Sequence, residues 1–144
     1  GDGATSTVQN PTHAYTEAGV FNVTLTVTDS IAATDSDETT ATITAPQPVI
    51  EIGEITGGLF KVNVVIKNTG DAAATDVVWS IKLDGGLILL GKSSTGTIPT
   101  IAAGGSATIT SKMIVGFGKT TITVTADTAT KDQAATVLLI FIKI

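Results

Sequence analysis

The stretch NPTHAYTEAGVFNVTLTVTD, residues 10–29, decides the fold of this chain. From Phe21 to Thr28, apolar side chains occupy every odd position and polar side chains occupy every even position. Strict alternation of β-branched and aromatic residues with polar ones predicts a strand that has one buried face. Gly19, in the turn before it, lets the chain reverse into that strand. The same signals recur along the chain, so we predict an all-β protein.

A proline-flanked segment, Ala45-Pro46-Gln47-Pro48, divides the strand patterns into two groups. Proline cannot donate to a strand ladder and holds the chain extended, so residues 46–48 are predicted to link a domain over 1–45 to one over 49–144. In the first domain we expect a loop over 30–37 and a closing strand over 38–44. The second should hold about seven strands, which is typical of a β-sandwich. We place these strands at 49–55, 60–66, 77–83, 87–90, 106–115, 120–126 and 135–144, with a hairpin turn at 84–86, a loop over 91–105 and a turn at 116–118.

Composition and charge exclude several classes of function. Hydrophobic residues make up 42% of the chain but aromatic residues only 4%, so the cores must consist of Val, Ile, Leu and Ala. The formal charge is -5 and the eight basic residues are scattered along the sequence, which argues against a nucleic-acid partner and against an anionic membrane surface. No apolar run approaches the ~20 residues of a membrane-spanning helix.

The chain has no cysteine, so it contains neither disulfides nor thiolate metal sites. This composition fits a cytosolic protein as well as a surface protein that uses no disulfides. The chain begins at Gly1 without a methionine or an apolar leader, and we therefore expect a processed or excised piece of a longer protein.

The first 44 residues resemble the C-terminal half of a PKD domain, an immunoglobulin-like β-sandwich of surface and secreted proteins. The resemblance rests on GDG at residues 1–3, NPTHAY at 10–15, Gly19 and FNVTLTVTD at 21–29, in the order of the family. The tryptophan-aspartate-phenylalanine segment that leads into GDG in the family is absent here. We therefore expect tandem immunoglobulin-like β-sandwiches of which the first is incomplete.

The second domain resembles the CARDB type of immunoglobulin-like module, found in archaeal and bacterial surface proteins. The matching segments are VIKNTGDAAATDVVWSIKL, IPTIAAGGSATI and GKTTITVTAD. They are turn and strand features with little chemistry in them. What the resemblance implies is spacing, adhesion or presentation at the cell surface.

Three conspicuous side chains are expected to be structural. His13 is the only histidine, and no nucleophile accompanies it, so we expect it to bond nearby loop backbone and not to catalyse. Tyr15 precedes the alternating strand as a tyrosine corner does. Trp79 alternates with Val77 and Ile81 and is expected in the core of the second sandwich. Gly118-Lys119-Thr120 is similar to the end of a phosphate-binding loop, but a strand pattern follows where that motif needs a helix.

Acidic residues of the first domain raise the question of a calcium site. The carboxylates concerned are Asp2, Asp29, Asp35, Asp37 and Glu38. Calcium prefers several carboxylate oxygens close together on turns, and the PKD resemblance allows such a site, although an EF-hand spacing is missing. No cofactor is required on either interpretation. Asn22, in Asn-Val-Thr, also matches the N-glycosylation pattern on the polar side of its strand.

The C-terminal segment is unusual because both of its alternating faces are apolar. It comprises Val137, Leu138, Leu139, Ile140, Phe141 and Ile142. A central strand under a flanking loop explains it; alternatively, the strand adds to an incomplete sheet of a neighbouring subunit. The apolar side of the first domain likewise needs a cover, from upstream residues or from another subunit. Repeated head to tail, such strand exchange would build a filament.

Two functions are compatible with these features of the sequence. The first is a non-catalytic extracellular or cell-surface structural or adhesive module, a repeat or subunit of a stalk or filament. Its partners would be other surface-protein modules or further copies of itself. The alternative is an accessory, substrate-positioning region of a larger secreted protease or glycosidase. An enzyme within these residues is not expected, because no nucleophile, base and orienting group converge.

Overall fold

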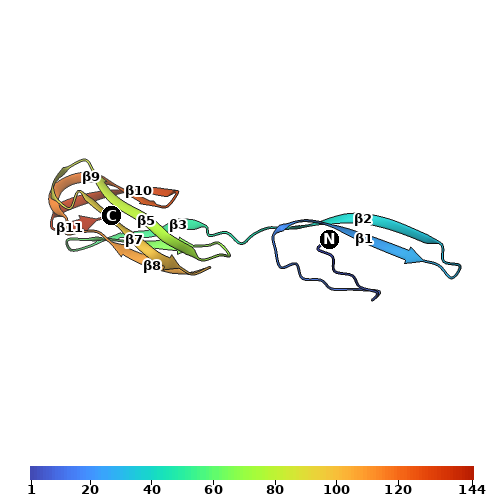
Figure 1. Cartoon of the computed structure of the whole chain (residues 1–144). Coiled ribbons are helices and arrows are strands. Elements are labelled where there is room, and N and C mark those ends of the chain that lie inside the picture. The colour runs from blue at the N-terminus through green and yellow to red at the C-terminus, as the bar shows by residue number, and fades with distance from the viewer. The chain divides into compact units, whose positions relative to one another are not determined.

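The computed structural model describes residues Gly1–Ile144, and every regular element in it is a β-strand (Figure 1). The prediction of an all-β fold is confirmed. The chain divides into two compact units, Gly1–Ala45 (unit 1) and Pro46–Ile144 (unit 2). It contains no helix of the length and apolarity needed to cross a membrane.

Unit 1 is built on one antiparallel hairpin. Strand β1 (Gly19–Thr28) pairs along its whole length with β2 (Thr34–Ile43). The predicted loop over 30–37 is therefore wrong, because the reversal is confined to the few residues between the strands. The Asp29 carboxylate accepts hydrogen bonds from the backbone amides of Ile31 and Ala33, and this tight turn lets pairing resume at once.

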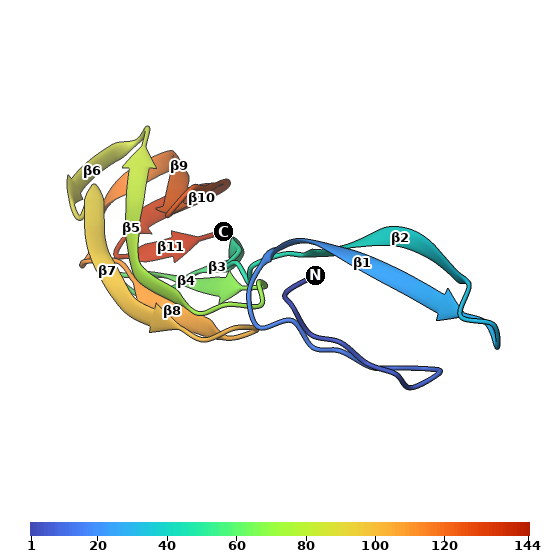
Figure 2. The same ribbon diagram turned by 45° about the vertical axis from the view of Figure 1, so that its right-hand side comes forward.

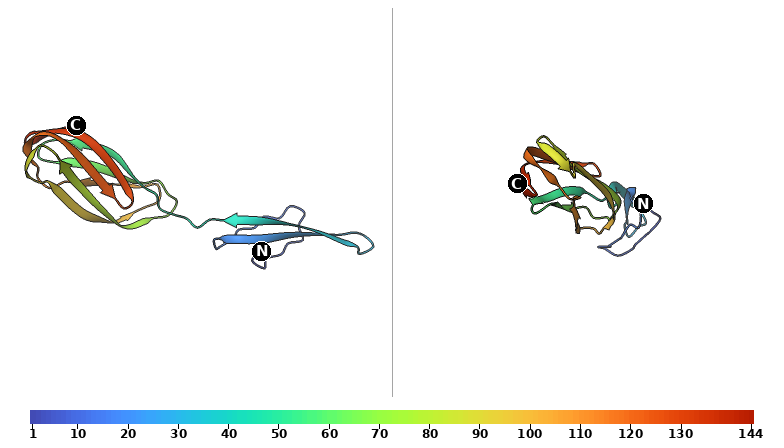
Figure 3. Two further views of the ribbon diagram at one scale, coloured as in Figure 1. Left: turned by 90° about the horizontal axis from the view of Figure 1, so that it is seen from above. Right: turned by 90° about the vertical axis from the view of Figure 1, so that its left-hand side faces the viewer.

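The segment before β1 runs beside the hairpin (Figure 3). Its N-terminal amino group donates to the backbone carbonyl of Asn22. Tyr15 stacks on Phe21 with ring centroids 4.4 Å apart, and these contacts cover one end of the apolar side of β1. Val23, Leu25 and Val27 on the same side stay exposed, and no residue of unit 1 is fully buried.

Unit 2 is a sandwich of two antiparallel sheets (Figure 2). The smaller sheet has the order β3-β4-β8, and the larger has the order β11-β10-β9-β5-β7 with β6 paired to β9. The bounds are β3 (Ile50–Gly57), β4 (Val62–Asn68), β5 (Ala74–Asp84), β6 (Leu87–Leu90), β7 (Ser93–Ile101), β8 (Ser106–Thr110), β9 (Val115–Ala126), β10 (Ala129–Leu139) and β11 (Phe141–Lys143).

The core of unit 2 lies between these sheets and consists of aliphatic side chains. The smaller sheet contributes Val62, Val64 and Ile66 of β4, which are fully buried and alternate with more exposed residues. Ile81 of β5 and Ile122 of β9 are equally buried in the larger sheet. Burying one such side chain is worth about 1.5–3 kcal/mol, so this cluster dominates the stability of unit 2.

Strand β7 occupies most of the region predicted as a loop over 91–105, so that prediction is wrong. Its composition of Ser, Thr, Gly and Pro suggests a loop, but it pairs with β5 from Lys82↔Ser93 to Ala74↔Ile101. Because β7 is the edge strand, Pro99 can sit in it without removing a ladder bond. Tertiary pairing here overrides local composition.

The predicted hairpin at 84–86 and the predicted turn at 116–118 are also wrong. Strand β6 does not fold back on β5; it pairs with the start of β9, with Leu87 opposite Phe117 (Figure 2). Gly116 lies inside β9, and a Cβ atom there would overlap the carbonyl of Leu87. This glycine therefore serves the close approach of two strands and not a reversal of the chain.

The ends of two further predicted strands differ from the structure. β8 ends at Thr110. At the next residue the side chain takes part in place of the strand ladder, since the Ser111 hydroxyl accepts a hydrogen bond from Val62 N at 3.0 Å. The predicted strand over 135–144 begins earlier, at Ala129, and breaks at Ile140. Strand β11 then folds back on β10 so that Ile142 lies opposite Val137.

Candidate functional site

The predicted structural residues of unit 1 form one exposed cluster. His13 Nε2 lies 2.7 Å from an Asp2 carboxylate oxygen, and its ring meets Tyr15 edge to face at 4.6 Å. The Asp2 carboxylate also accepts from the amide of Ala4, which lowers the pKa of Asp2, and the bond to His13 lowers it further. The cluster has no nucleophile. Its side chains hold the N-terminal segment to Phe21 of β1.

The carboxylates proposed for calcium take separate roles. Asp2 binds His13 and Asp29 holds the hairpin turn. Asp37 and Asp35 of β2 lie opposite Leu25 and Val27 and so share the apolar side of the hairpin, whereas Glu38 is on the other side, where it accepts from Thr24. No group of three or more His, Cys, Asp or Glu side chains is arranged to hold a metal ion. A calcium site in unit 1 stays a prediction from the sequence.

Two other residues predicted from the sequence lie on strands. Asn22 is exposed on β1, opposite Thr40, and its glycosylation stays a prediction. Trp79 of β5 is partly buried and packs against the core of unit 2. A Cβ atom on Gly96 would come within 2.6 Å of the indole ring, so the glycine opposite provides the space that the ring occupies.

The segment proposed for strand exchange is paired within unit 2. Val137 and Leu138 belong to β10, which is hydrogen-bonded to β9 on one side and to β11 on the other. Val137 and Ile142 are buried, whereas Leu138, Leu139 and Phe141 are about half exposed; Ile140 is the break between the strands. Donation of this segment to a neighbour would first require β10 and β11 to leave their own sheet. Strand exchange stays a prediction.

Sequence reasoning missed the role of Asn68, a fully buried side chain at the end of β4. Its amide oxygen accepts from two backbone amides and its amide nitrogen donates to three carbonyls: Val49 N, Gly70 N, Ala72 O, Ile101 O and Ala102 O. The Asn-Thr-Gly signal predicted a turn, but only the fold shows which segments this side chain joins.

At the other end of unit 2, Lys119 and Lys143 line an open cavity of about 660 Å³, which also contains Asp84. The cavity lies beside β9, β10 and β11, and its other lining residues are mainly threonine and alanine. No catalytic arrangement of side chains faces it. The residues that line this cavity come from distant parts of the sequence, so no local motif could have predicted the cavity.

Comparisons with known proteins agree with this division. A family model described as a PKD domain matches residues 1–45, and a model described as CARDB matches residues 54–133. The pre-pro-metalloprotease PrtV of Vibrio cholerae is 32% identical over 102 residues, which are 69% of this chain and 11% of that protein. Collagenase ColA of Bacillus cereus is 49% identical over 43 residues, 30% of this chain and 4% of the collagenase.

The chain thus spans about a tenth or less of the length of the curated relatives it matches. The similarity to PrtV covers more of the chain than one unit, whereas the similarity to ColA is no longer than unit 1.

Proposed function

Because this chain belongs to the CARDB family and carries a PKD domain ahead of its CARDB module, we propose that it is a non-catalytic accessory segment of a larger secreted protein. PKD and CARDB modules are non-catalytic immunoglobulin-like domains. The observation that carries the proposal is the similarity of 69% of the chain to a segment of a pre-pro-metalloprotease. The segment would lie outside the cell and position a neighbouring domain on its substrate.

The side chains of both units support a role without catalysis. The one histidine is engaged with Asp2 and packs on Tyr15, so it neither contacts a serine nor faces a cleft. The surface instead exposes apolar strand residues, among them Val23, Leu25 and Val27 of β1, which suit contact with an extended surface. One relative is named a collagenase, and a fibrous protein of the kind that this name implies is the substrate class that we propose.

A fusion experiment tests this function. The chain is joined to a protease domain that has no binding module, and turnover is measured on an insoluble fibrous substrate and on a small peptide. We expect faster cleavage of the fibre and unchanged cleavage of the peptide. Equal turnover on the fibre with and without the chain would contradict the proposal, as would hydrolysis by the isolated chain.

A second candidate is a structural or adhesive surface module, completed by strand exchange into a filament or stalk. The exposed Val23, Leu25 and Val27 of β1 favour it, since a strand or sheet from another molecule would bury them. Sedimentation velocity tests it: concentration-dependent assembly should occur and should be lost in Leu25→Lys. A monomer at all concentrations would count against this candidate.

A further inference from the structure

One row of apolar side chains crosses the outer surface of the larger sheet of unit 2. Leu87, Phe117, Leu138 and Phe141 lie directly opposite one another on four neighbouring strands, and Leu59 bridges to Phe141. Residues opposite each other in antiparallel pairs project to the same side. These five side chains, the apolar row, are 47–62% exposed.

Two lysines with a threonine between them form a second row, the lysine row, parallel to the apolar row. Lys119 lies opposite Thr136, which lies opposite Lys143. On β9, β10 and β11, each of these residues is two positions away from a residue of the apolar row. Because side chains two residues apart on a strand share a face, both ammonium groups stand beside the apolar row. None of the lysines of the chain lies within ion-pair distance of a carboxylate, and Asp84 is the acidic residue in the cavity next to this row.

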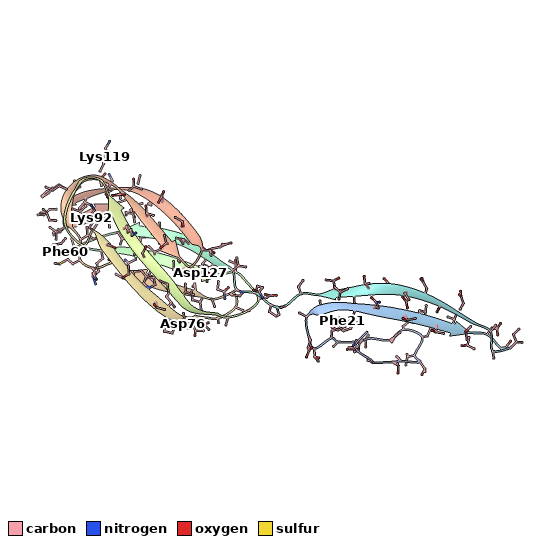
Figure 4. All side chains as sticks on the ribbon, turned by 45° about the horizontal axis from the view of Figure 1, so that its top comes forward. Phe21, Phe60, Asp76, Lys92, Lys119 and Asp127 are labelled. Atoms are coloured by element: carbon pink, nitrogen blue, oxygen red, sulfur yellow. The ribbon has the colours of Figure 1, made fainter.

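Charged side chains are also distributed unevenly along unit 2. Phe60, Lys92 and Lys119 lie at the end that carries the apolar row, whereas Asp76 and Asp127 lie at the opposite end (Figure 4). All eight basic residues of the chain are lysines of unit 2, and unit 1 has six carboxylates and no basic side chain. The formal charge of -5 is thus the sum of -6 for unit 1 and +1 for unit 2, and it conceals a basic apolar surface.

We propose that this end of unit 2 docks on an anionic lipid membrane. Leucine and phenylalanine side chains fit the boundary between headgroups and acyl chains, and lysines beside them extend their ammonium groups to anionic headgroups. A protein partner is less well matched, because the cores of protein interfaces are enriched in Arg, Met and aromatic residues but depleted in Lys, and lysines flank the apolar row here. Phe117 and Phe141 suit either kind of partner, but the lysines beside them and the absence of arginine from the chain favour lipid.

The net negative charge of the chain does not oppose this docking. Charges separated by more than about 8 Å are largely screened at physiological ionic strength, so the groups nearest the lipid decide the interaction. The lysine row shares β9, β10 and β11 with the apolar row, which continues onto β6, so both rows reach a flat surface together. This inference is independent of the proposed accessory function and concerns a different contact.

Cosedimentation of the full chain with lipid vesicles tests the docking. We expect binding to vesicles of phosphatidylcholine with phosphatidylglycerol, none to pure phosphatidylcholine, and weaker binding as salt rises. One lysine near an anionic surface contributes about fivefold in affinity, so Lys119→Gln with Lys143→Gln should weaken binding about 25-fold. The matched pair Lys67→Gln with Lys82→Gln, outside the row, should leave it within about twofold.

The apolar row is tested by two substitutions of one exposed residue. Phe117→Ser should weaken vesicle binding about tenfold. In Phe117→Trp, the new indole should be quenched by lipids brominated in their acyl chains, whereas Trp79 in the unaltered chain should not. Far-UV circular dichroism checks that each variant folds. If Phe117→Ser does not fold, the double variant of Lys119 and Lys143 still tests the proposal.

Three results would overturn the proposal. The first is no cosedimentation with anionic vesicles at low salt. The second is equal weakening by both lysine pairs, which would mean that total charge and not this surface decides binding. The third is self-association that Phe117→Ser abolishes, without vesicle binding, which would make the row an interface between proteins.

Discussion

Asn68 ties together three segments of unit 2 that are far apart in the sequence. Its side chain is buried, accepts from Val49 N at 3.0 Å and donates to Ile101 O at 3.1 Å, so it joins the start of β3 with the end of β7. Removing one partner of a buried hydrogen bond leaves the other unsatisfied at a cost of about 1–3 kcal/mol. Asn68 therefore stabilises the end of unit 2 next to the linker.

We predict that Asn68→Ala lowers the free energy of unfolding of unit 2 by at least about 2 kcal/mol. Urea unfolding followed through the fluorescence of Trp79 measures this change. Asn63→Ala is the matched control, since Asn63 is exposed and bonds only with neighbouring strand residues; it should cost less than about 0.5 kcal/mol. Equal effects of the two variants would contradict the assigned role.

Asp2 provides a prediction about pH. Its pKa is lowered first by the hydrogen bond from Ala4 N and then by His13, so its carboxylate favours the folded arrangement above the pKa of the unfolded chain. That contribution is lost as the pH falls through the lowered pKa, which places the change below about pH 4. Carbon-13 NMR titration should give a midpoint below that of an ordinary aspartate, and His13→Ala should raise it part of the way. A midpoint unchanged by His13→Ala would show that the imidazole has no influence.

At the scale of elements, the close pairing of β6 with β9 depends on a glycine, which has no side chain to separate the strands. We predict that Gly116→Ala separates the two strands, because a Cβ atom would overlap the carbonyl of Leu87, and destabilises unit 2 by about 1–3 kcal/mol. Thermal unfolding measures the loss. Gly58→Ala is the control, since a Cβ atom there has no neighbour within 4 Å and the melting temperature should hardly change. A similar loss in both variants would mean that steric overlap is not the cause.

Strands whose side chains alternate between core and solvent could be predicted from the sequence. Val62 to Ile66 of β4 and Val77 to Leu83 of β5 show the period of two because one face of each is buried. Glycines that predicted hairpin turns in the sequence have other roles in the structure, which depend on tertiary contacts. Gly116 permits a close approach of strands, and Gly85 with Gly86 lets the chain pass from β5 to β6 without folding back on it.

The candidate lipid surface could not have been predicted in the same way. Leu87, Phe117 and Phe141 are far apart along the chain, and only strand order and register align them. Lys119 and Lys143 each look like an ordinary solvated residue in the sequence. The acidic total charge pointed away from a basic surface, because it averages two units of opposite character.

At the scale of the whole molecule, the two units differ in how much they bury. Unit 1 has no fully buried residue, and an isolated two-stranded hairpin is only marginally stable in water. We predict that backbone amides of β1 and β2 exchange with deuterium much faster than those of β4, β5 and β9 in the same chain. Hydrogen exchange with mass spectrometry distinguishes the units. Equal protection of the hairpin and the sandwich would contradict the prediction.

The confinement of all lysines to unit 2 affects how the chain resists proteolysis. No lysine or arginine occurs before Lys61, so an enzyme of trypsin type finds no cleavage site in unit 1, in the linker or in β3. The residues of unit 1 are the least buried of the molecule and would otherwise be the easiest to cut. Limited digestion with trypsin should leave residues 1–61 as one piece, whereas an elastase, which accepts alanine and valine, should open the same region quickly.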